Sequence, residues 1–183
     1  MSKFLLPGLA VAALSLPNFG CMSRMVSEGM GAATGASGKA VGTSVVPNLG
    51  TYKSLRIEPI TVAAGLQAPA DMPSMLRTDL ADVAEKRGLK PTGEPALKLS
   101  GEIIHYETAD MVDTAIGPLA QVIVRAKVTD AQTGKVIAQG NLIGRSKATA
   151  SSSEKSLAAG VGKALDKWLK EGGLKTASGK EGE

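Results

Sequence analysis

The stretch that decides the fold is VIVRAKVTDAQTGKVIAQG, residues 122–140 of the 183-residue chain. Its first half alternates apolar with mostly polar side chains, which is the period of a strand that rests one face on a core. The letters DAQTGK then interrupt the pattern, and Gly134 within them can adopt the positive φ that a tight turn requires. A second apolar run, KVIAQGNLI, follows. The stretch predicts a β-hairpin whose first strand points inward at Val122, Val124, Ala126 and Val128.

Two further strands are predicted before the hairpin. Residues 96–108 read ALKLSGEIIHYET, and their apolar phase changes around Gly101, which indicates a bulge at that residue. The apolar positions of this strand are Leu97, Leu99, Ile103 and Ile104. Residues 52–63 read YKSLRIEPITVA and alternate around Leu55 and Ile57. Pro59 then indicates a strand end or a sheet edge.

Two amphipathic helices are also predicted. The first has Asp71 as its candidate N-cap, Pro73 in its first turn and Gly88 as its stop signal. Its apolar face is formed by Met72, Met75, Leu76, Leu80, Val83 and Ala84. The second begins with a capping box, Ser151 and Glu154, and ends at Gly172 and Gly173. Its apolar stripe consists of Leu157, Val161, Ala164, Leu165, Trp168 and Leu169.

These elements predict a single α+β domain over residues 51–171, in the order β-α-β-β-β-α. About 120 residues are enough for one domain and too few for two. We expect a mostly antiparallel sheet with both helices packed on one of its faces. Residues 172–183, rich in Lys, Glu and Gly, are expected to be a disordered tail.

The chain begins with features of an exported protein. Lys3 is followed by an uncharged run of about fourteen residues, too short to span a bilayer, so residues 1–20 are predicted to be a signal peptide. After the run come Asn18, Phe19, Gly20 and Cys21, the chain's only cysteine. This junction resembles the lipobox of bacterial lipoproteins: Gly20 matches its last position, whereas Asn18 and Phe19 depart from it.

The lipobox resemblance implies cleavage between Gly20 and Cys21, with lipid attachment, palmitate included, at Cys21. Met22 in place of an aspartate favours the outer membrane, by similarity to enterobacterial sorting rules. Two or three acyl chains bury enough methylenes to make anchoring effectively permanent. The alternative is an ordinary secreted, soluble periplasmic protein in which Cys21 remains a free thiol.

Residues 21–50 are predicted to be a Gly/Ala/Ser-rich tether that carries the lipidated Cys21 and is too poor in apolar residues to fold. A glycine-zipper helix over residues 26–46 is the alternative, because glycines recur there at four-residue spacings. The letters ATGASGKA, residues 33–40, approach a phosphate-binding loop. They lack its hydroxyl, since Ala40 stands at that position.

Composition and isolated polar residues give no sign of catalysis, a metal or a cofactor. Only Lys3 is charged in residues 1–20, so 20 basic residues remain against 17 acidic ones. The basic residues are scattered and aromatics are 3%, which argues against nucleic-acid binding. His105, the only histidine, is interpreted as a sheet-surface or edge residue, and Trp168 as core.

The carboxylates are read in the same way. Asp79, Asp82 and Glu85 are interpreted as a solvated, ion-paired helix face together with Lys86. Asp110 and Asp113 supply too few ligands for a calcium loop. We therefore predict no metal site, no cofactor and no enzymatic activity.

The hairpin and the strand before it carry a family resemblance over roughly residues 52–170. The matching positions are Leu97, Leu99, Gly101, Ile103, Asp130, Thr133, Gly134 and Val136. They resemble bacterial envelope lipoprotein domains of unknown function. They are more distantly similar to the superfamily of the TolB amino-terminal domain and the curli-secretion lipoprotein.

The resemblance implies a membrane-anchored, non-catalytic binding or assembly module of the bacterial envelope that faces the periplasm. Its expected partners are the membrane and an envelope protein, without nucleic acid, and a homo-oligomer is an option. The alternative is an oligomeric structural or pore component that uses the glycine-zipper segment 26–46.

Overall fold

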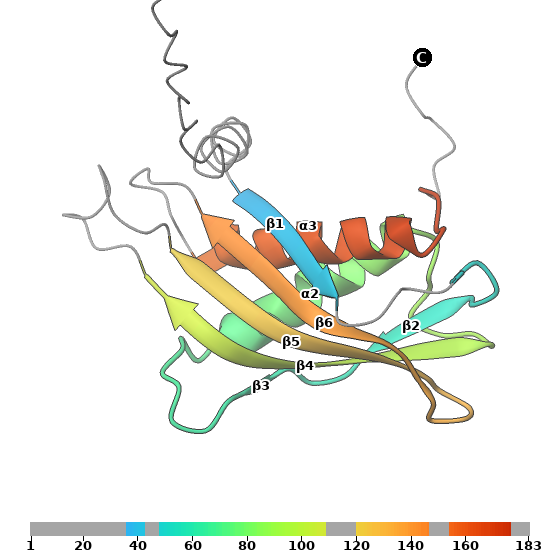
Figure 1. The fold of residues 1–183 in the computed structure, drawn as a ribbon, viewed down its shortest axis with the longest axis horizontal. Coiled ribbons are helices and arrows are strands. Elements are labelled where there is room, and N and C mark those ends of the chain that lie inside the picture. The colour runs from blue at the N-terminus through green and yellow to red at the C-terminus, as the bar shows by residue number, and fades with distance from the viewer. Residues whose placement is uncertain (1–35, 43–47, 109–119, 147–153, 177–183) are drawn as a thin grey trace, which may run out of the picture.

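The computed structural model describes residues 36–42, 48–108, 120–146 and 154–176 (Figure 1). These residues form an α+β domain, as predicted. The sheet follows the order β1-β6-β5-β4-β2, and the short strand β3 also pairs with β4. The strands are β1 (Ala36–Gly42), β2 (Ser54–Ile57), β3 (Thr61–Val62), β4 (Ala96–Glu107), β5 (Gln121–Asp130) and β6 (Val136–Ser146), and the helices are α2 (Met72–Lys86) and α3 (Glu154–Glu171).

The predicted hairpin is formed by β5 and β6, which pair antiparallel along their lengths. Its turn is held by Asp130, whose Oδ1 accepts hydrogen bonds from the backbone N–H groups of Gln132 (3.0 Å) and Thr133 (2.7 Å). Gly134 has a φ of 71°, the conformation that the turn demands of it. The inward positions Val122, Val124, Ala126 and Val128 are all buried.

Strand β4 pairs antiparallel with β5, but its bulge does not lie at Gly101 as predicted. The register shifts between Ile103 and His105 instead. Gly101 keeps the inward phase of Leu99 and Ile103, since the register is unbroken there. Ile60 packs against it on the core side: a Cβ on Gly101 would lie 2.8 Å from Ile60 Cδ1. The glycine therefore marks a close side-chain contact and not a break in the ladder.

The opening strand of the predicted domain lies at a sheet edge, as Pro59 indicated. Strands β2 and β3 lie on either side of Pro59, and both pair parallel with β4, so the sheet is mostly but not wholly antiparallel. Helix α2 makes the crossover from β3 to β4. It ends with Gly88 at a φ of 81°, and the Leu89 N–H bonds the Ala84 carbonyl.

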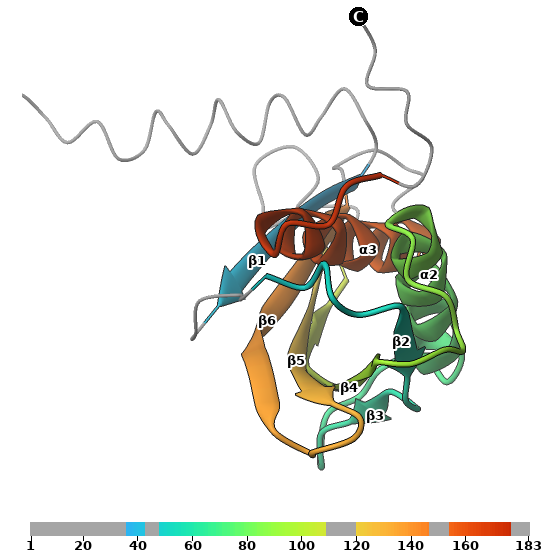
Figure 2. The same cartoon turned by 90° about the vertical axis from the view of Figure 1, so that its right-hand side faces the viewer.

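Both helices cover the same face of the sheet, as predicted (Figure 2). The predicted apolar stripe of α3 is buried throughout, Trp168 included, and the buried residues of α2 are Met72, Leu76, Leu80 and Ala84. The N-cap prediction for α2 was wrong in one respect. Asp71 occupies the cap position but makes no side-chain cap bond, and its carbonyl accepts the Met75 N–H (3.0 Å).

The domain extends beyond both predicted boundaries. Residues 36–42, assigned to the tether and to the glycine-zipper alternative, form strand β1, antiparallel to β6. Leu49, also assigned to the tether, is buried. At the other end, Leu174 is buried, and its N–H bonds the Leu169 carbonyl (3.1 Å) after Gly173 at a φ of 85°. The predicted tail is therefore ordered as far as the described residues reach.

Candidate functional site

The predicted lipid-attachment site lies outside the described residues. Gly20 and Cys21 fall within 1–35, so the cleavage and acylation predictions stay predictions. The same holds for Ser151 of the capping box and for Asp110 and Asp113. The structure does describe the strand that follows the predicted anchor, β1, and the two outer surfaces of the domain.

Strand β1 is held by a glycine seam, formed by Gly38 of β1, Gly144 of β6 and Gly160 of α3. A Cβ on Gly160 would lie 2.7 Å from the Ser37 carbonyl oxygen and 2.9 Å from Gly144 Cα. Side chains at Gly38 and Gly144 would collide with the backbone of α3, at Gly160 and Leu157 respectively. The backbones of helix and sheet therefore touch directly, and only glycine fits at the three positions.

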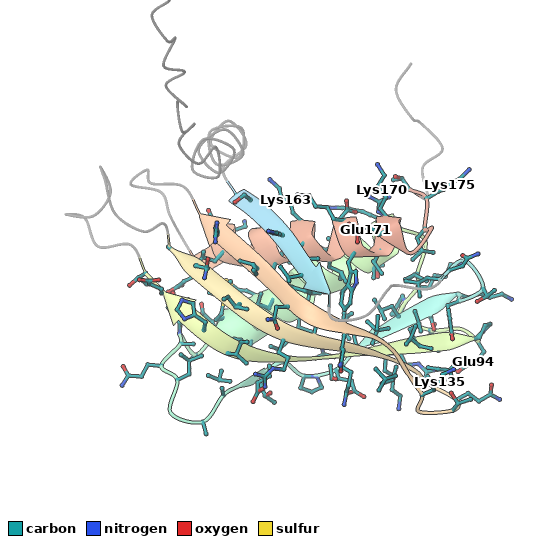
Figure 3. The ribbon with its side chains drawn as sticks, in the orientation of Figure 1. Glu94, Lys135, Lys163, Lys170, Glu171 and Lys175 are labelled. Carbon is teal, nitrogen blue, oxygen red and sulfur yellow. The ribbon has the colours of Figure 1, made fainter. Side chains whose placement is uncertain are left out.

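Lysines of α3 cover the free edge of β1. Lys163 Nζ donates to the Ala36 carbonyl (2.7 Å), and Lys167 Nζ, one helical turn later, donates to the Gly38 carbonyl (2.8 Å). Figure 3 shows Lys163 rising from α3 beside β1. Edge strands with free carbonyls invite pairing with other strands, and charged lysines are a common protection against it. Two carbonyls of the β1 edge are thus occupied by charged side chains, which protects the edge.

The second face of the sheet, opposite the helices, is open and hollowed in the middle. We call it the open face. The backbone of Gly101, Ala126 and Gly140, which are in register across β4, β5 and β6 and whose side-chain positions face the core, crosses the middle of this face. A hollow of about 530 Å³ lies over these three residues. Polar side chains surround it, contributed by Thr61, Ser100, Glu102, Arg125, Lys127, Gln139 and Asn141.

The open face gathers positive charge that is scattered in the sequence. By strand register its basic residues are Lys39, Arg56, Lys98, Arg125, Lys127 and Arg145, and its acidic residues are Glu102 and Glu107. Glu94, which lies outside the strands, pairs with Arg56 (2.6 Å), so the surplus is three of the formal net charge of +4 of the whole chain. Arg125 contacts Glu102 (3.2 Å) across the strands, with 65% of its side chain exposed. The rest of the chain is therefore close to neutral.

The single histidine belongs to this open face, as its interpretation required. His105 Nε2 lies 3.5 Å from Glu107 Oε2, and both side chains are more than 40% exposed. No group of three or more His, Cys, Asp or Glu side chains suited to a metal ion occurs among residues 36–42, 48–108, 120–146 and 154–176. No helix in these ranges is long and apolar enough to cross a membrane.

The outer side of α2 is acidic, and its carboxylates are not ion-paired with Lys86 as predicted. Asp82 and Glu85 are exposed and, within the described part of the chain, form no ion pair with Lys86 or any other residue. Asp79 is half-buried beside them. Burial raises the pKa of Asp79 and the neighbouring Asp82 raises it further, whereas Lys155 and Lys86 lower it. Among the described residues, Asp82 and Glu85 therefore leave negative charge on this side of the helix.

Two polar contacts tie distant segments together, and sequence patterns did not suggest them. The Tyr52 hydroxyl donates to Asp130 Oδ2 (2.9 Å), which joins the start of the predicted domain to the hairpin turn. Hydrogen bonds from Thr133, and then from Tyr52, lower the pKa of Asp130. Arg87 donates two 2.7 Å hydrogen bonds to Asp166, and these lower the pKa of Asp166. Both carboxylates are thereby kept ionised.

The structure thus defines a two-layer α+β domain with a protected N-terminal edge strand, a basic open sheet face and an acidic helix face. No protein-family model and no curated protein matches the chain. Among solved structures, the fold is similar to that of a PelC dodecamer from Paraburkholderia phytofirmans, with a TM-score of 0.52 and 16% identity. The match covers 72% of this chain and 96% of that chain.

A variant PelC dodecamer from the same organism gives a TM-score of 0.50 at 14% identity, over 73% of this chain and 96% of that one. At such identities the likeness shows a shared fold alone. Protein XCC0632 from Xanthomonas campestris matches more weakly, with a TM-score of 0.45, 15% identity and coverage of 70% and 92%. The more distant similarity to the TolB and curli-secretion superfamily stays a prediction.

Proposed function

We propose that this chain is a lipoprotein of the bacterial cell envelope, anchored in a membrane through acyl chains on Cys21. Its domain would act without catalysis, by self-assembly and by binding an envelope protein. The observation that carries the proposal is the uncharged run that ends at Gly20 and Cys21, directly upstream of a folded domain. Met22 favours the outer membrane, with the domain facing the periplasm.

The position of β1 supports a short anchor arm. Fifteen residue steps separate Cys21 from Ala36, where β1 begins. A fully extended chain of this length spans at most roughly 50 Å. Docking of β1 therefore keeps the domain closer to the membrane than an arm running to Leu49 would, which could span roughly 95 Å.

Self-assembly is supported by the shared fold. PelC, whose fold resembles this one over 96% of its chain, is described as a dodecamer. A non-catalytic role is supported by the setting of His105: the histidine and its neighbouring carboxylate Glu107 both face solvent on the open face. Catalytic acids and bases are more often held in clefts that shift their pKa.

The anchoring half is tested by metabolic labelling with an alkyne-bearing palmitate in a bacterial host, with Cys21→Ser as the matched control. We expect label and membrane association for the natural chain and neither for the variant. Equal labelling of both chains would remove the anchor. Release of the natural chain as an unlabelled soluble periplasmic protein would establish the secreted alternative with a free thiol.

The assembly half is tested by native mass spectrometry of the detergent-extracted protein. We expect a discrete species of more than two copies. A monomer at all accessible concentrations would contradict self-assembly while leaving the anchor intact.

A further inference from the structure

An assembly of more than two copies requires two different contact patches on every copy, whether one interface is repeated head to tail or two interfaces alternate. Sheet extension at β1 is disfavoured as one of these patches. Lys163 and Lys167 already occupy the Ala36 and Gly38 carbonyls along that edge. On the opposite side of the sheet, the Leu55 N–H of edge strand β2 already donates to the Lys90 carbonyl. The faces of the domain are therefore the better candidates.

The open face offers the first patch. Lys127 lies there opposite Ser100 in the register, and Lys98 lies two residues before Ser100 on the same strand; neither has an ion-pair partner in the described part of the chain. Lys127 lines the hollow together with Gln139 and Asn141, and Lys98 lies outside the lining on the same face. Unpaired cations around a polar hollow favour an acidic partner surface.

The outer side of α2 offers the second patch. Asp82 and Glu85 are exposed and unpaired among the described residues, and Asp79 next to them has a raised pKa, because burial and Asp82 disfavour its charge. Lys155 and Lys86 offset part of the repulsion between the two aspartates, and a further cation placed against Asp82 and Glu85 would relieve more of it. The two patches thus carry exposed charges of opposite sign.

The shapes of the two patches also agree. Three strands spaced at about 4.8 Å give the hollow a width of roughly 10 Å, which is close to the diameter of an α-helix. Helix α2 has 15 residues and is therefore about 22 Å long. Figure 2 shows α2 on the side of the molecule away from the open face of β5 and β6, so one copy can present both patches at once.

We infer that copies of this chain associate head to tail, with the acidic outer side of α2 of one copy seated on the basic open face of the next. The inference rests on the proposed self-assembly and adds the surfaces that carry it. Lys98 and Lys127 of one copy would face Asp82 and Glu85 of its neighbour. Contacts of this kind are weakened by salt, because exposed charges are screened over about 8 Å at physiological ionic strength.

Charge reversal tests the pairing in the full detergent-extracted protein at low salt, with native mass spectrometry as the readout. The sheet variant carries Lys98→Glu and Lys127→Glu, and the helix variant carries Asp82→Lys and Glu85→Lys. We expect each variant alone to lose the oligomer and appear as a monomer. A mixture of the two should regain assemblies that contain both chains, since each reversed patch then meets its opposite.

The matched control carries Lys53→Glu and Lys135→Glu, which changes the charge as much as the sheet variant does. Both residues are exposed and, unlike Lys98 and Lys127, lie outside the strands that form the open face. The control should assemble as the natural chain does, and circular dichroism should give the same spectrum for all four proteins. If both face variants assemble like the natural chain, or if their mixture stays monomeric, the surface assignment is wrong although self-assembly stands. If the natural chain itself is monomeric, self-assembly fails as well.

Discussion

The glycine seam predicts opposite effects of alanine at two glycines of α3. Gly160→Ala should lower the stability of the domain, whereas Gly162→Ala, two residues later, should raise it. In Gly160→Ala the new methyl group would lie 2.7 Å from the Ser37 carbonyl oxygen, 2.9 Å from Gly144 Cα and 3.0 Å from the Arg145 nitrogen. All three atoms belong to the backbone of β1 or β6, so no side chain can rotate away. Relief requires that α3 move outward by several tenths of an ångström.

The magnitude follows from two opposing effects. Overpacking of this kind costs about 3 kcal/mol at the upper end of its usual range. The better helix propensity of alanine returns about 1 kcal/mol. We expect Gly160→Ala to lower the free energy of unfolding by about 2 kcal/mol. In a domain of this size that corresponds to a melting temperature lower by roughly 8 °C.

Gly162→Ala is the matched control within the same helix. Its methyl group would meet Val83 Cγ2 at 3.4 Å and Asp79 Cβ at 3.7 Å, which are ordinary contacts. Only the propensity gain applies, so the variant should be more stable by about 0.5–1 kcal/mol. Urea unfolding followed by circular dichroism measures both changes. A Gly160→Ala protein as stable as the natural one, or an equal loss in both variants, would refute the close-contact reading of the seam.

Three further predictions concern polar contacts. The double variant Lys163→Ala and Lys167→Ala removes the side chains that cover the β1 edge. Amide hydrogen exchange of residues 36–42, measured by mass spectrometry, should become faster by roughly tenfold or more, because hydrogen bonds from charged groups contribute about 1.5 kcal/mol each. Unchanged exchange would show that the lysines do not hold β1. Arg87→Ala should destabilise the domain by about 2 kcal/mol in urea unfolding, since Asp166 loses a bidentate partner whose own side chain is only 10% exposed. As a control, Lys170→Ala, on the same helix as Asp166, should change stability little. The pKa values of Asp130 and Asp166 are lowered in the folded state, so the ionised carboxylates stabilise the fold at pH values above the unfolded pKa of about 4. This contribution to the free energy of unfolding is lost as the pH falls through the folded pKa values. The melting temperature should therefore drop between pH 5 and pH 2, and it should drop less in Asp130→Asn.

Local patterns in the sequence were sufficient for the elements whose side chains form the core. The hairpin β5–β6 and both helices were predicted because their apolar periods reflect burial of those same residues. Strand β1 could not be predicted in this way. Its inward residues are Ala36, Gly38, Ala40 and Gly42, whose composition is that of a linker. What makes it a strand is a close backbone approach by Gly160, more than a hundred residues away.

The charge of the open face escaped prediction for a related reason. Arg56, Arg125, Lys127 and Arg145 stand singly in the sequence, and only the register of four strands, β2, β4, β5 and β6, brings them to one surface. The alternation of small residues in β1 was a signal that could have been read as a period of two. The bulge of β4 was misplaced because a glycine in a strand marks either a bulge or a close contact, and Ile60 decides between them only in the folded chain.

The edge cover and the proposed anchor have a joint consequence for assembly. Copies held on one membrane meet at a high effective concentration, which favours any contact that they can make. An uncovered β1 edge would then allow strand-to-strand growth without a defined end. Because Lys163 and Lys167 protect that edge and the glycine seam keeps β1 seated, association is directed to the faces of the domain. Contacts between faces are set by complementary charge and shape, and they can close into an assembly of fixed size.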